Sequence, residues 1–105
     1  MATYLFAYTA GSAARNDEDT ASTIASWGHW FTTLGDAVVD AGNPFGPAAT
    51  VTGDGGVADG TAAGLSGYSL VKADDLAAAT MLTKGCPVLA DGGTVQIYEA
   101  IPITM

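Results

Sequence analysis

The sequence has few basic residues. Three lysines and arginines stand against eleven acidic residues, which gives a formal net charge of −8 at pH 7. Nucleic acids and anionic membrane surfaces are bound through clustered cations, so this balance excludes both as expected partners. The excess of acidic side chains favours solubility.

Cysteine and histidine are equally scarce, with one residue of each, Cys86 and His29. A single cysteine cannot form an intrachain disulfide, and no Cys/His cluster with metal-ligand spacing is present. We therefore expect no metal and no cofactor, and a lone thiol favours a reducing, cytoplasmic location. No apolar run approaches membrane-spanning length. The 105 residues predict one domain, residues 1–105.

The first apolar stretch, residues 3–9, predicts a strand. Tyr4, Phe6 and Tyr8 alternate with Leu5 and Ala7, so both faces of this strand are apolar. That pattern is typical of a strand covered on two sides.

A long helix is predicted over residues 21–41. Large apolar side chains recur there at three- and four-residue steps and form one stripe: Ile24, Trp27, Phe31, Leu34 and Val38. Glycines inside a helix cost about 1 kcal/mol each relative to alanine. Gly35 therefore indicates either a closely packed backbone or a break in the helix, and Gly42 followed by Asn43-Pro44 ends it.

The second half of the chain has clearer boundaries. Residues 48–52 predict a second strand, and the glycine-rich Gly53–Gly67 segment is interpreted as a flap. Residues 68–73 predict a third strand, and residues 75–84 a helix that Asp74 caps and that Gly85 and Pro87 terminate, with Leu76, Ala79 and Leu82 on its buried side. Residues 94–101 predict a fourth strand.

This β-α-β-β-α-β order is that of a ferredoxin-like α+β sandwich with an antiparallel sheet. Two helices can cover only one face of such a sheet. The strands carry apolar side chains on both faces, so a second copy of the chain is the expected cover for the other one. The pattern thus predicts a homodimer joined through its sheet faces.

Three segments resemble the YCII-related, or DGPF-domain, family. They are GYSLVKADDLAAATMLTKGCPVL, GGTVQIYEAI and the shorter Ala41-Gly42-Asn43-Pro44. The resemblance covers most of the chain in order and spacing, and roughly the last 40 residues closely.

The resemblance implies a ferredoxin-like fold that pairs into a dimeric α/β barrel. The wider barrel group includes muconolactone-isomerase-like and monooxygenase-like proteins, and some relatives are accessory proteins of transcription regulators. The family's Asp-Gly-Pro-Phe motif is represented here by Asp59-Gly60 followed by Thr61-Ala62. Better-studied relatives have a proposed active-site histidine near the start of the first helix. The matching residues here, 24–26, have no titratable side chain.

Several side chains are candidates for chemistry or binding. His29 is the candidate general acid–base, although it lies on the polar side of the predicted helix, opposite the apolar stripe. Aromatic residues from three strands and the helix are candidates for lining a ligand cleft: Tyr4, Tyr8, Tyr68, Tyr98 and Trp27. The alternative for each is a core residue with a solvated polar tip.

Three functions therefore remain open from the sequence. The first is a dimeric module that binds a small apolar or aromatic molecule in a cleft between the sheet and the helices or the partner. The second is a small metal-free enzyme of the barrel group, either an isomerase or lyase or a monooxygenase-like protein. The third is a structural or accessory regulatory module.

Overall fold

The computed structural model describes residues 1–9, 17–90 and 92–103, and the side chains of its first helix from residue 24 onward. In chain order the elements are β1 (Ala2–Thr9), α1 (Asp17–Leu34), the 3₁₀ turn η1 (Gly35–Ala37), β2 (Val38–Asp40), β3 (Ala49–Val51), β4 (Val57–Asp59), β5 (Leu65–Ala73), α2 (Leu76–Leu82), the 3₁₀ turn η2 (Thr83–Gly85), α3 (Pro87–Ala90) and β6 (Thr94–Ala100). The α+β class with an antiparallel sheet is confirmed.

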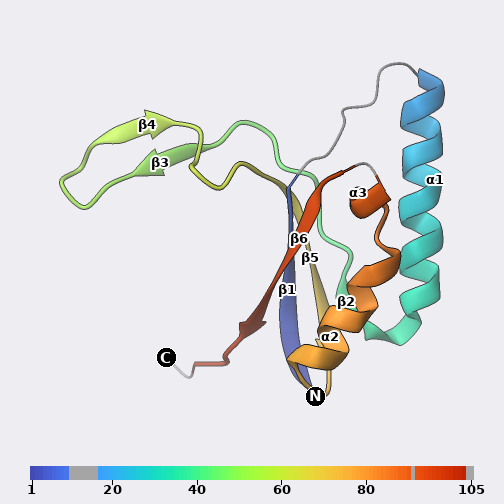
Figure 1. Cartoon of the computed structure of the whole chain (residues 1–105). Helices are drawn as coiled ribbons and strands as arrows, with labels where there is room; N and C mark the ends of the chain where they lie inside the picture. Colours follow the sequence, from blue (N-terminus) through green and yellow to red (C-terminus); the bar gives the residue numbers. More distant parts are fainter. Residues whose placement is uncertain (10–16, 91, 104–105) are drawn as a thin grey trace.

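The body of the protein is a four-stranded antiparallel sheet with strand order β2-β5-β1-β6. The three helices lie on one side of this sheet (Figure 1). We call that side the helix-covered face and the opposite side the outer face. None of the helices within the described residues combines the length and the hydropathy that crossing a membrane requires.

The core lies between the helix-covered face and the helices. Strand register places Tyr4 opposite Val71, and Phe6 opposite Ser69, so their side chains share this face. Trp30 of α1 packs onto them and is 4% exposed, and its indole Nε1 donates to the Leu82 carbonyl at 3.2 Å. This bond satisfies the polar atom that burial of a tryptophan would otherwise leave unpaired.

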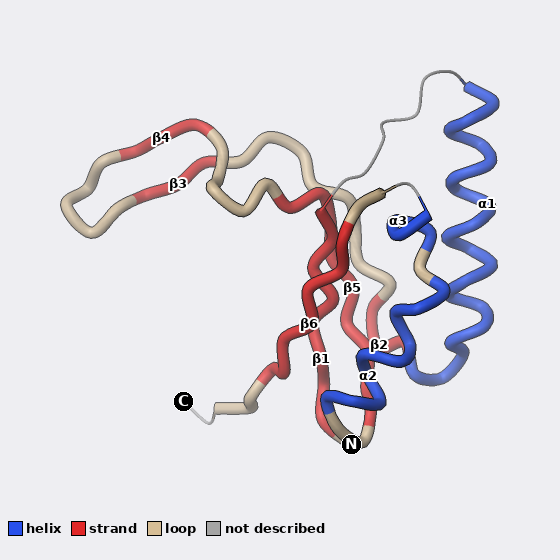
Figure 2. Tube along the Cα trace, in the orientation of Figure 1, coloured by secondary structure: helices blue, strands red, loops and turns tan. Residues whose placement is uncertain are grey.

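The hairpin β3–β4 is separate from the main sheet and forms a two-stranded sheet of its own. It projects as an arm on the side away from the helices (Figure 2). Its turn is closed by Asp54, whose carboxylate accepts hydrogen bonds from the Thr52 hydroxyl and, at 2.9 Å, from the Gly56 amide. Val51 and Val57 pair across the arm and are 70% and 72% exposed.

The prediction of one helix over residues 21–41 is wrong at its end. The helix stops at Leu34 because Gly35 adopts a left-handed conformation, with φ of 58°, and Val38–Asp40 then pairs with β5 as an edge strand. The predicted second strand, residues 48–52, is a strand of the arm and not of the main sheet. The break in the helix, rather than a close-packed backbone, is therefore what Gly35 provides.

The boundaries of the next helix also differ from the prediction. Asp75, not Asp74, is its N-cap, with the carboxylate accepting from the Ala78 amide at 2.8 Å. Gly85 lies in the turn η2 without a positive φ, and a Cβ there would lie 3.3 Å from the Trp30 ring. Pro87 begins α3 instead of following the last helix. Leu76, predicted on the buried side, is exposed in the first turn of the helix, whereas Ala79 is fully buried.

Candidate ligand-binding pocket

A pocket of about 420 Å³ lies between α1 and the sheet, bordered by the loop that follows β2. This volume is within the range of about 300–1,000 Å³ that small-molecule sites occupy. Its lining combines aromatic, aliphatic and hydroxyl side chains with backbone: Tyr8, Ile24, Trp27, Phe31, Ala41, Gly42, Asn43, Pro44, Ser66, Gly67, Tyr68, Ser69 and Val88.

One wall of the pocket is aromatic and comes from α1. Trp27 and Phe31 are four residues apart and so lie on the same side of the helix, with ring centroids 5.9 Å apart. The Trp27 ring meets Tyr8 of β1 edge to face, with centroids 4.8 Å apart and planes at 73°. Edge-to-face contacts of this kind fix ring orientation as well as burying area. The wall is thus held in place from both the helix and the sheet.

A chain of hydrogen bonds crosses the floor of the pocket. The Tyr8 hydroxyl donates to Ser69 Oγ at 2.8 Å, and Ser69 Oγ donates to the Ala41 carbonyl at 2.7 Å. Ser66 Oγ donates to the Tyr8 carbonyl at 3.1 Å. Burial raises the pKa of the Tyr8 phenol well above its ordinary value, although the bond to Ser69 acts in the opposite direction. Tyr8 is therefore a neutral polar group at physiological pH.

The rim of the pocket is a loop that lies directly on β5. Gly42 has a φ of 76°, and a Cβ at this position would lie 1.7 Å from the Tyr68 carbonyl oxygen, so only glycine fits. The Gly42 amide donates to the Asp40 carboxylate at 2.8 Å, and the Tyr68 amide donates to the Asn43 carbonyl at 3.3 Å. Phe45 stacks on the Tyr68 ring with centroids 5.7 Å apart. These contacts position the rim without any contribution from a ligand.

The structure brings two of the five predicted cleft residues together and separates the others. Tyr8 and Trp27 are in contact in the pocket, and Tyr68 borders it while its ring stacks on Phe45. Tyr4 is buried in the core, away from the pocket lining. Tyr98 lies opposite Leu5 in the register of β6, which puts it on the outer face, where it is 56% exposed.

His29, the candidate acid–base, is exposed on α1 and does not line the pocket. It lies between Trp27 and Trp30 in sequence, and the helical period turns it away from the face that those two rings present to the sheet. In the described part of the chain, no group of three or more His, Cys, Asp or Glu side chains could hold a metal ion. Cys86 is buried, and burial raises its thiol pKa to about 11, so it is a poor nucleophile.

Sequence reasoning missed the two serines of the floor and the tryptophan behind the wall. Ser69 is fully buried between glycine and valine positions that share its face, and a polar residue on an otherwise apolar face was the available signal. Trp30 lies three residues after Trp27 and is not part of the predicted apolar stripe, so its burial was not expected. Ile24, which is part of that stripe, is 67% exposed at the mouth of the pocket.

No protein-family model, no curated protein and no solved structure matches this chain.

Proposed function

We propose that this protein binds a small apolar or aromatic molecule in the pocket between α1 and the sheet. The observation that carries the proposal is the combination of an aromatic wall, Trp27 and Phe31, with a hydrogen-bonded floor, Tyr8 and Ser69, in one cavity of about 420 Å³. Pockets that bind small molecules are typically apolar with a few placed polar groups.

An enzyme of the barrel group is less well supported by the same residues. Among the described residues that line the pocket, two are titratable, Tyr8 and Tyr68, and the strand register puts the side chain of Tyr68 on the outer face. General acid–base catalysis works best when the pKa of the group is near the working pH. Burial moves the pKa of Tyr8 in the wrong direction for that role. The arrangement therefore favours binding over proton transfer.

Binding is tested with two bicyclic aromatic probes, indole and benzofuran, by titration calorimetry. The variant Ile24→Glu places a carboxylate at the mouth of the pocket, on an exposed position where the fold tolerates it. Its matched control is Leu76→Glu, an exposed aliphatic residue of α2 outside the pocket lining. We expect the wild type and the control to bind at least one probe, and Ile24→Glu to lose about tenfold or more in affinity. If neither probe binds the wild type, or if both variants bind alike, the proposal is wrong.

The same proposal includes a ferredoxin-like arrangement and a homodimer. The strand order β2-β5-β1-β6, with α1 between β1 and β2 and α2 between β5 and β6, supports the ferredoxin-like assignment, with the arm as an insertion. We propose that two copies meet through their outer faces to form the dimeric α/β barrel that the YCII-related resemblance implies.

Charge distribution supports a second copy as the cover of the outer face. On β1, β5 and β6 the register puts one charged side chain, Lys72, on this face, although the chain carries eleven acidic residues. The other residues there are Thr3, Leu5, Ala7, Thr9, Leu65, Tyr68, Leu70, Thr94, Gln96, Tyr98 and Ala100. The edge strand β2 adds one carboxylate, Asp40, which pairs with Leu70 and accepts a hydrogen bond from the Gly42 amide. Over β1 and β6, two such faces can approach without carboxylates opposing one another, which would cost stability. The buried free thiol of Cys86 supports a reducing, cytoplasmic location.

A further inference from the structure

The hydrogen bonds on the floor of the pocket have only one allowed direction. A backbone carbonyl can only accept, so the bond between Ser69 and Ala41 takes the hydroxyl hydrogen of Ser69. Ser69 Oγ then has no hydrogen left for Tyr8, and the bond between these two residues must take the hydrogen of the Tyr8 phenol. The chain therefore runs from Tyr8 through Ser69 to Ala41.

The hydroxyl hydrogen of Ser66, the other serine of the floor, is also used within the protein. Ser66 Oγ donates to the Tyr8 carbonyl, again because a carbonyl can only accept. Each of these hydroxyl oxygens keeps lone-pair capacity, while its hydrogen is used within the protein. Tyr8 and Ser69 are both buried and Ser66 is half-buried, and all three residues line the pocket, so a polar group of a ligand at the floor meets hydroxyl oxygens whose hydrogens are already used. The floor thus offers acceptors and no uncommitted hydroxyl hydrogen.

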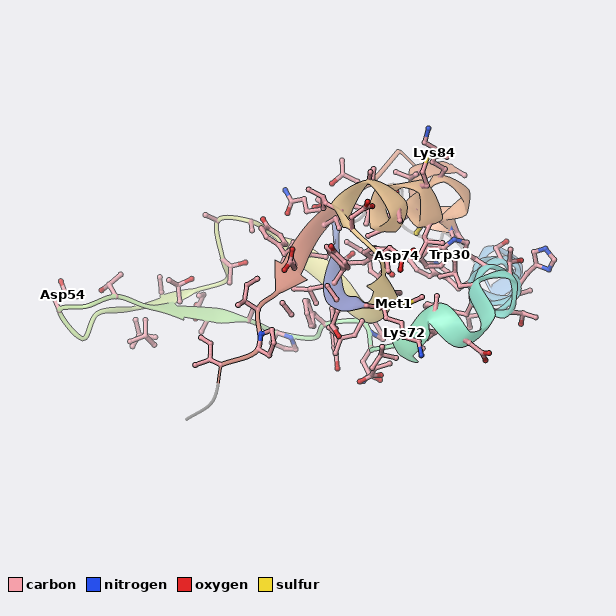
Figure 3. The ribbon with its side chains drawn as sticks, turned by 90° about the horizontal axis from the view of Figure 1, so that it is seen from below. Met1, Trp30, Asp54, Lys72, Asp74 and Lys84 are labelled. Atoms are coloured by element: carbon pink, nitrogen blue, oxygen red, sulfur yellow. The ribbon has the colours of Figure 1, made fainter. Side chains whose placement is uncertain are left out.

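Charge leads to the same conclusion. No lysine or arginine is present among the described residues that line the pocket. Lys72 lies beside Met1, at the end of the sheet far from Tyr8, and Lys84 projects outward from the body (Figure 3). The chain as a whole carries a net charge of −8. Among the described residues that line the pocket, a carboxylate would meet neither a cation nor a free hydroxyl donor, and binding it through Tyr8 would break the bond to Ser69.

We infer that the ligand carries a neutral hydrogen-bond donor on an aromatic body, an N–H or O–H of the indole or phenol type, and that it donates to Tyr8 Oη. The inference rests on the proposed function, because it specifies the ligand class of the same pocket. Trp27 and Phe31 supply the contacts for the aromatic body, and the lone pairs of Tyr8 Oη select for the donor. The Asn43 amide at the rim has both donor and acceptor atoms and does not discriminate between ligands.

The test compares indole with benzofuran, which has nearly the same shape but has an oxygen acceptor in place of the N–H donor. Titration calorimetry on the wild type is expected to give indole an affinity about 3- to 10-fold higher than that of benzofuran, and indole-2-carboxylate a lower affinity than indole. Equal affinities for indole and benzofuran would overturn the inference and leave the proposed function standing. Binding of neither would overturn the proposed function itself.

Two variants test whether the preference for indole over benzofuran comes from the hydroxyl groups of the floor. In Tyr8→Phe the acceptor is removed, so indole should weaken to the level of benzofuran, whose affinity stays unchanged. In Ser69→Ala the Tyr8 hydrogen is released to the ligand, so benzofuran should tighten and the preference for indole should shrink. A preference for indole that persists in Tyr8→Phe would place the donor contact elsewhere and overturn the assignment. The comparison of indole and benzofuran on the wild type remains decisive if either variant fails to fold.

Discussion

The two sides of the main sheet carry the same kinds of large side chain, which are buried on one side and exposed on the other. On the helix-covered face Val71 is fully buried, and Tyr4 and Phe6 are buried beside it. On the other side the outer face carries exposed Tyr98, and the arm presents Val51 and Val57 to solvent. We call the outer face and the arm together the uncovered side. Valine and tyrosine are compatible with burial and with exposure, so the helices, which cover one face of the sheet, determine where these large side chains are buried.

This difference locates the stability of the protein. Buried apolar area contributes about 25 cal/mol per Å², and the helix-covered face holds most of the large buried side chains. The arm is a two-stranded hairpin held by its ladder and by the turn at Asp54. Hairpins of this kind are marginally stable in water unless something packs against them. The uncovered side is therefore expected to depend on a partner, and the helix-covered side is not.

The largest expected effect on the free energy of unfolding comes from removing a buried side chain between the helices and the helix-covered face. Trp30→Ala removes a buried indole that packs against Phe6 and Phe31 and donates to the Leu82 carbonyl. We expect a loss of about 3–5 kcal/mol in the free energy of unfolding, measured by urea denaturation. Val57→Ala on the arm, an exposed position, should change it by less than about 0.5 kcal/mol. Comparable losses in the two variants would contradict the division between the sides.

The next largest effect is expected on dimer formation through the outer face. Tyr98→Glu puts a carboxylate on the outer face, where two copies of it would be buried in the proposed dimer. We expect dimer dissociation to become at least about 100-fold easier, or roughly 2.7 kcal/mol, measured by light scattering across protein concentration. Met81→Glu, at an exposed position on α2, is the matched control and should remain dimeric. A wild type that is monomeric at micromolar concentration would rule out the homodimer.

Much of the covered side was predictable because its signals are local. The alternation of Tyr4, Phe6 and Tyr8 is a property of neighbouring residues, and so is the apolar spacing of the last strand. Strand β2 was missed because Val38 continues the helical spacing of Trp27, Phe31 and Leu34. Only the left-handed Gly35 and the pairing with β5 turn this segment into a strand, and strand pairing is a nonlocal interaction.

The pocket was predictable in part for the same reason. Tyr8 and Trp27 are notable by residue type, since large amphipathic rings commonly line ligand sites. The roles of Ser66 and Ser69 depend on strand register and on a carbonyl at Ala41, 28 residues before Ser69 in the chain. No local pattern encodes such a partner, so the direction of the hydrogen-bond chain could be recognised only after the fold was known.

The smallest effect should be confined to the arm and should depend on pH. The hydrogen bond from Thr52, with that from the Gly56 amide, lowers the pKa of Asp54 below its ordinary value of 3.8. A lowered pKa in the folded state means that the carboxylate stabilises the turn fully above pH 3.8 and that this contribution is lost as the pH falls through the lowered value. Amide hydrogen exchange at Gly56 should therefore show less protection once Asp54 is protonated, after correction for the intrinsic pH dependence of exchange. The core amides of β1 and β5 should keep their protection over the same interval.

Asp54→Asn keeps an acceptor oxygen and should weaken the turn less than Asp54→Ala, without a pH dependence of its own. Loss of protection in the arm and the core together would show that the two sides unfold as one unit, contrary to the division drawn from their burial.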